Sequence, residues 1–114
     1  MKTIIGQQGE VVIIKIDAIP QTETNPVAMG KRGYIISHSE SGHHHVLTGG
    51  DVMERTKDVP AGMKVFYAIL DNPESFIQDA PNPHGGYDLV PGMYEFRVSR
   101  EYDPFAEQAR VVAD

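Results

Sequence analysis

The sequence predicts an all-β protein, either a small antiparallel β-barrel or a β-sandwich, with a short C-terminal helix. Eleven glycines and eight prolines are spread along the 114 residues, so turn signals recur about every ten residues. Between the turns lie short runs rich in β-branched and aromatic residues, at residues 10–17, 34–38, 44–47, 64–70 and 93–99. Short strands at this spacing are typical of barrels and sandwiches, here of about seven to nine strands.

The hydrophobic pattern separates two kinds of strand. Residues 11–14 and 65–70 are apolar without alternation, which predicts strands covered on both faces. Both runs are too short for a buried helix. Residues 93–99 alternate, which predicts a strand with one solvent-facing side and one buried side formed by Tyr94, Phe96 and Val98.

Two segments break this pattern. Residues 19–31 have little periodicity and several breakers, so we expect a surface loop that could act as a flap. Near the C-terminus, Asp103 suits a helix cap and Pro104 the first helical position. The apolar side of this expected helix is formed by Phe105, Ala109 and Val112.

Length and composition limit the possible functions. We expect one domain over residues 1–114, because this length supports a single core. The absence of cysteine excludes disulfides, thiolate nucleophiles and iron–sulfur clusters. Sixteen acidic against ten basic residues give a net charge of −6, which opposes binding to phosphate backbones. We therefore expect no nucleic-acid partner.

The sequence shows neither the apolar run of a membrane helix nor that of a signal peptide. The longest apolar run has six residues, Val65 to Leu70, about a third of the length that a membrane helix needs. Gln7, Gln8 and Glu10 interrupt the N-terminal apolar stretch before it reaches the length of a signal peptide. The expectation is a cytoplasmic protein without a membrane partner, or one in the host cytoplasm if it is phage-encoded.

A cluster of histidines is the strongest candidate for a functional site in this sequence. In Gly42-His43-His44-His45, an extended backbone would point His43 and His45 to one side and His44 to the other. Two imidazoles on one side can share a metal ion, for which nitrogen and oxygen ligands favour Zn, Mn, Fe or Ni. Further ligands would come from His84, with His38 and Glu40 as additional candidates. The alternative is an exposed turn, or histidines that fix a hairpin by bonding backbone carbonyls.

The same motif resembles the cupin family, in which His-x-His and a later Pro-x-Gly turn occur in a small β-barrel. Here His43, His45 and the turn Pro60-Ala61-Gly62 fit that pattern. The expected Glu after His45 and the expected His after Gly62 are absent. The resemblance therefore implies a cupin-like architecture, and the cupin metal ligands are not carried over as a set.

The chain also resembles a family of short, uncharacterised bacterial and phage proteins. The similar stretches are a Gly-His-x-His motif at residues 42–45, His84-Gly85, residues 89–94 and Arg100-Glu101-Tyr102-Asp103-Pro104. The family pattern coincides with His43, His45 and His84, and has a variable position at His44. The resemblance implies a complete stand-alone protein and assigns no activity to it.

These observations favour a non-catalytic binding or assembly module of phage or bacterial origin, expected to form a homo-oligomer. The alternative is a metal-dependent, cupin-like enzyme or small-molecule binder that uses His43, His45 and His84. The sequence does not decide between an enzyme and a binding protein, and it does not identify the ligand.

Overall fold

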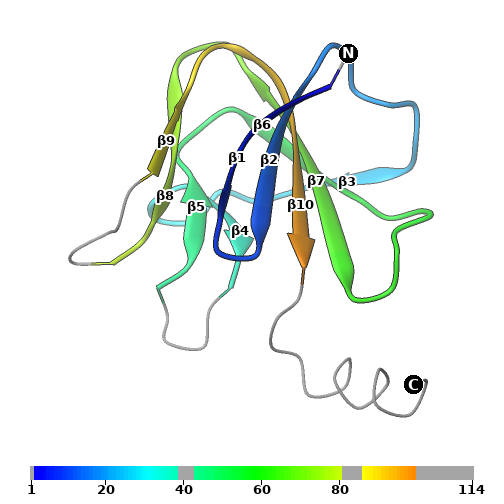
Figure 1. Ribbon diagram of the computed structural model, residues 1–114, viewed down its shortest axis with the longest axis horizontal. Coiled ribbons are helices and arrows are strands. Elements are labelled where there is room, and N and C mark those ends of the chain that lie inside the picture. The colour runs from blue at the N-terminus through cyan, green and yellow to red at the C-terminus, as the bar shows by residue number, and fades with distance from the viewer. Residues whose placement is uncertain (1, 39–42, 81–85, 100–114) are drawn as a thin grey trace.

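The computed structural model describes residues 2–38, 43–80 and 86–99, which form two antiparallel β-sheets (Figure 1). The six-stranded sheet has the order β1-β2-β10-β7-β6-β3, and the four-stranded sheet has the order β4-β5-β8-β9. The bounds are β1 Thr3–Gln8, β2 Val11–Ile16, β3 Thr24–Pro26, β4 Tyr34–Ser37, β5 His45–Leu47, β6 Asp51–Arg55, β7 Met63–Leu70, β8 Glu74–Gln78, β9 Gly86–Leu89 and β10 Gly92–Ser99.

The prediction of an all-β fold is confirmed, and of its two forms the sandwich is the one observed. A closed barrel is not found in the described part of the chain, because each sheet keeps two edge strands. At one edge, Pro26 in the three-residue β3 has no amide hydrogen to donate to a further strand. A barrel of the cupin kind is therefore not supported. The expected C-terminal helix lies outside the described residues.

The prediction of a surface loop over residues 19–31 is wrong at one point. Thr24–Pro26 forms β3, which pairs with β6 in an antiparallel register. The pairing places a short strand in a segment of low β-propensity, because the partner strand supplies the hydrogen bonds. No helix long and apolar enough to cross a bilayer occurs in residues 2–38, 43–80 and 86–99.

Strand β10 runs between β2 and β7 in the middle of the larger sheet (Figure 1). In this register Phe96 lies opposite Ile13 of β2 and Phe66 of β7. These side chains face the four-stranded sheet, where Phe96 meets Phe76 with ring centres 5.3 Å apart. The main core between the sheets consists of Val11, Ile13, Ile36, Leu47, Val52, Phe66, Ala68, Leu70, Phe76, Leu89, Tyr94, Phe96 and Val98.

The outer face of the six-stranded sheet has a second apolar cluster. Its buried members are Ile14, Ile16, Val65 and Tyr67, with Ile19 and Val59 among the side chains packed against them. Ile19 follows β2 and Val59 precedes β7, so the two connecting segments cover part of this face. The prediction that residues 11–14 and 65–70 are covered on both sides is confirmed, and the covering here comes from loops.

One tyrosine connects the two sheets along a side of the sandwich. The Tyr87 hydroxyl, on β9, accepts a hydrogen bond from the Gln7 amide at 3.2 Å and donates to the Gln7 carbonyl at 3.0 Å. Gly6 makes room for the ring, because a Cβ there would lie 2.4 Å from the nearest ring atom of Tyr87. The edge strands β1 and β9 are thereby held together by one side chain.

Candidate functional site

His45 opens strand β5 and points into the sandwich. It is only 8% exposed, and its ring stacks on Phe76 with centres 6.1 Å apart. Its Nδ1 lies 2.8 Å from Oε1 of Gln8, the last residue of β1. Its Nε2 faces Gly9, where a Cβ would lie 2.9 Å away. In this arrangement the imidazole joins the β1–β2 turn to the four-stranded sheet.

A second polar contact supports the same junction. Ser37, buried at the end of β4, donates a hydrogen bond to the Glu10 carboxylate. The two contacts join residues on either side of the β1–β2 turn to the first two strands of the smaller sheet. His43, by contrast, is exposed and precedes β5, so strand alternation does not fix the direction of its side chain.

The histidines that lie together are His38 and His44. Their rings meet edge to face with centres 4.9 Å apart and an angle of 69° between planes. Burial lowers the pKa of His38 below its ordinary value, and the neighbouring His44 and Lys64 lower it further. The sequence pattern did not predict this pair, because it depends on the register between β4, which His38 follows, and β5, which His44 precedes.

The predicted metal site cannot be assembled from the described residues alone. His84 and Glu40 lie outside them, and no three His, Asp or Glu side chains within residues 2–38, 43–80 and 86–99 come close enough to share an ion. The site formed by His43, His45 and His84 stays a prediction.

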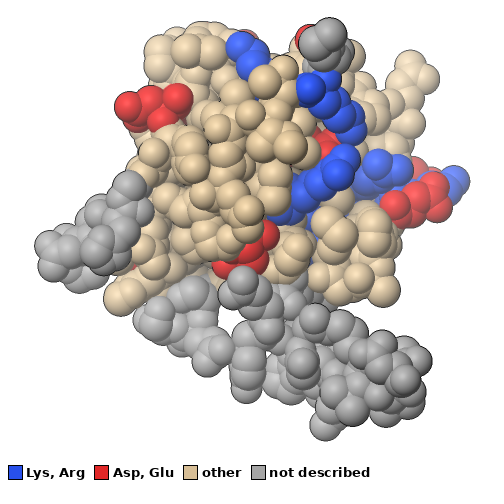
Figure 2. All heavy atoms as spheres, viewed as in Figure 1, with Lys and Arg blue, Asp and Glu red and all other residues tan. Residues whose placement is uncertain are grey.

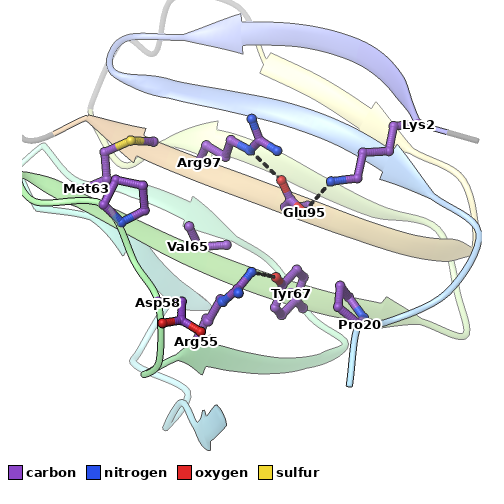
Figure 3. Close-up of a pocket in the computed structure, with 10 residues that line it drawn as sticks. Lys2, Pro20, Arg55, Asp58, Met63, Val65, Tyr67, Glu95 and Arg97 are labelled. Atoms are coloured by element: carbon purple, nitrogen blue, oxygen red, sulfur yellow. Dashed lines mark hydrogen bonds and ion pairs between the residues drawn. The ribbon is translucent and has the colours of Figure 1, made fainter. Parts of the chain in front are cut away.

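A pocket of about 300 Å³ opens on the outer face of the six-stranded sheet (Figure 3). Strands β7 and β10 form its floor, and its rim is formed by Lys2, the end of β6 and the segments that precede β3 and β7. We call it the cationic pocket, and its lining residues are Lys2, Pro20, Arg55, Asp58, Pro60, Met63, Val65, Tyr67, Glu95 and Arg97.

The carboxylate of Glu95 organises one side of the cationic pocket. Glu95 is 2% exposed, although it lies on the side of β10 that the sequence predicts to face solvent. A buried carboxylate is costly unless it is paired. Here Oε1 lies 3.3 Å from Lys2 Nζ and Oε2 accepts a hydrogen bond from Arg97 Nε at 2.5 Å. The Lys2 and Arg97 side chains remain 55% and 45% exposed, so their remaining donors reach the solvent side.

Arg55 lies at the opposite wall (Figure 3). Its Nε donates to the carbonyl of Lys57 at 2.7 Å, and its Nη1 lies 3.2 Å from the Tyr67 hydroxyl. The pocket thus contains three cationic side chains against two carboxylates, those of Asp58 and Glu95. Figure 2 shows Lys and Arg side chains gathered in a band on the right of this face. The local charge is positive in a chain of net charge −6.

The sequence interpretation missed this pocket. Glu95 and Arg97, two positions apart on a central strand, were one available signal, since such residues share a face. Lys2 and Arg55 are distant in the sequence and reach the pocket only through the sheet order. No local sequence motif predicts that these side chains lie in one pocket.

Fold and site together define a small antiparallel β-sandwich domain with a charged pocket on the outside of its larger sheet. The chain belongs to the domain family of unknown function DUF8820, which matches residues 7–99. The match includes Arg55, Tyr67, Glu95 and Arg97 of the cationic pocket, and Lys2 precedes it. No curated protein and no solved structure matches this chain.

Proposed function

We propose that this protein is a non-catalytic binding module that holds a small anionic ligand in the cationic pocket. The observation that carries the proposal is the pairing of Lys2 and Arg97 on one buried carboxylate, Glu95. This anchoring fixes two flexible cationic side chains before a ligand arrives. Less conformational entropy is then lost on binding.

The unused donors favour an anion with two oxygens. Arg97 uses only Nε toward Glu95, and no other described residue forms a hydrogen bond or ion pair with its two Nη groups. A planar guanidinium can bind a carboxylate or phosphate group through two parallel hydrogen bonds. Arg55 across the pocket adds a second guanidinium, so an anion between them would meet positive charge from both walls.

The size and floor of the pocket limit the rest of the ligand. A volume of about 300 Å³ is at the small end of the range for ligand pockets. Val65 and Met63 give the floor an apolar part, and Pro20 adds an apolar portion of the rim. The ligand class that fits is a small carboxylate or phosphate ester with a short apolar group.

Calorimetric titration with benzoate, and with benzamide as its neutral counterpart, tests the proposal. We expect benzoate to bind more tightly than benzamide, and its binding to weaken as salt is added. Arg55→Ala and Arg97→Lys should each weaken benzoate binding by about fivefold to tenfold. Arg97→Lys keeps a cation beside Glu95, so the fold is retained.

Lys57→Ala is the matched control. It removes one exposed positive charge beside the pocket while the Lys57 carbonyl that holds Arg55 stays in place. Benzoate binding should change less than twofold, within the range of an exposed charge. Equal binding of benzoate and benzamide, or an equal loss in Lys57→Ala, would contradict the proposal.

A further inference from the structure

A histidine pair at one end of strands β4 and β5 lies apart from the cationic pocket. Strands β4 and β5 are antiparallel, with Ser37 opposite His45. One residue further along, this register puts His38 opposite His44. Ser37 and His45 are buried, whereas His38 is exposed and His44 half-buried. His38 directly follows β4 and His44 directly precedes β5, so the two histidines lie just beyond the paired ends of these strands.

A β-bulge creates this alignment. The register of β4 against β5 shifts between Ile35 and Ser37, so that Ile36 has no partner of its own. Without the extra residue, His38 would lie opposite His43 instead of His44. Bulges re-aim side chains at the ends of paired strands. Here the shift brings the two imidazoles into contact with each other.

We propose that His38 and His44 together bind a divalent transition metal ion of the zinc or nickel type. A tetrahedral ion about 2.0–2.1 Å from one nitrogen of each imidazole would hold the ring centres about 5 Å apart. The observed separation is 4.9 Å. Small rotations of the two side chains would therefore bring one nitrogen of each ring to the ion while the backbone stays in place.

The surroundings define the kind of site. Lys64 lies near enough to His38 to lower its pKa. Close by, Nη1 of Arg32 lies 3.0 Å from Oδ1 of Asp79. The Asp79 amide in turn donates to the His44 carbonyl at 2.7 Å, which fixes the backbone at this ligand. Two protein ligands leave the remaining coordination positions to water. The result is an open and exchangeable site, in contrast to a closed structural zinc site.

The test uses the full chain without a histidine tag, titrated with zinc chloride and with nickel chloride. Calorimetry measures the affinity, and side-chain NMR identifies the imidazoles that respond. We expect the His38 and His44 signals to shift and His38→Ala and His44→Ala each to lose binding. Thermal unfolding of both variants checks the fold, which these side chains at the surface should affect little.

His43→Ala is the matched control, since His43 is the exposed neighbour of the pair. It should bind as the wild-type chain does, and so should Arg97→Lys in the cationic pocket. This second control keeps the inference independent of the proposed function. Three results would overturn the inference: no binding by the wild-type chain, undiminished binding in His38→Ala or His44→Ala, or loss of binding in His43→Ala.

Discussion

The two sides of strand β10 bury their residues in different ways. On the inner side, Phe96 is fully buried among aromatic and aliphatic side chains between the sheets. On the outer side its neighbour Glu95 is 2% exposed and lies against two cations. Equal burial thus reflects two kinds of stabilisation. Phe96 on the inner side gains from removing apolar surface from water, whereas burial of Glu95 on the outer side is tolerated only as long as its charge is balanced.

The largest effect is expected on the inner side. Phe96→Ala should lower the free energy of unfolding by about 3–5 kcal/mol, because it leaves a cavity opposite Phe76. Met93→Ala, at a half-buried position on the outer side of the same strand, should cost only about 1–2 kcal/mol. Urea unfolding of both variants measures the difference. Similar losses in the two variants would remove the distinction between the sides.

The outer side should respond asymmetrically when its charges are removed. Arg97→Ala leaves the Glu95 carboxylate buried with Lys2 alone, so we expect a loss of up to about 3 kcal/mol. Glu95→Gln leaves two cations that are already half in water, so we expect about 1.5 kcal/mol. Urea unfolding at low and high salt measures both losses. A greater loss in Glu95→Gln would show that the carboxylate stabilises the fold for another reason.

The smallest effect concerns His38, which follows β4 of the other sheet. Its pKa should lie below the ordinary value of 6.5, chiefly through burial and then through His44 and Lys64. The unfolded chain then binds more protons near this pH, so the contribution of His38 to stability is present above pH 6.5 and declines as the pH falls below it. An NMR titration of the free chain measures this pKa.

His44→Ala sharpens that measurement. Removing the neighbouring ring should raise the pKa of His38 part of the way toward 6.5, because burial is the largest cause and remains. Lys64→Ala should also raise the pKa of His38, by a smaller amount than His44→Ala. A pKa of His38 at or above 6.5 in the wild-type chain would contradict the described surroundings.

The central strands could be predicted from the sequence, and several peripheral strands could not. The runs at residues 10–17, 64–70 and 93–99 correspond to β2, β7 and β10, whose apolar character is visible locally. Strand β6 contains Asp51, Glu54 and Arg55, and its extended form depends on pairing with β7 and β3. Strand propensity depends strongly on such context.

The cationic pocket and the histidine pair could not be predicted from the sequence, for related reasons. Alternation correctly assigns Glu95 to the outer side of β10, but burial there depends on Lys2 and Arg97. Alternation also separates His44 from its neighbours, but only the bulge in β4 brings it opposite His38. Both sites arise from the register between strands, which a single sequence does not specify.

The contact of Tyr87 with Gln7 has a consequence for association between chains. An incoming strand would add to the edge of β1 through the free amide and carbonyl groups there, and at Gln7 the phenol already occupies one of each. The bulge of β1 between Ile4 and Gly6 also disturbs the regular spacing of backbone donors and acceptors that an added strand would need. Both features oppose the addition of further strands at the β1 edge. We therefore expect any homo-oligomer of this chain to assemble through a different surface.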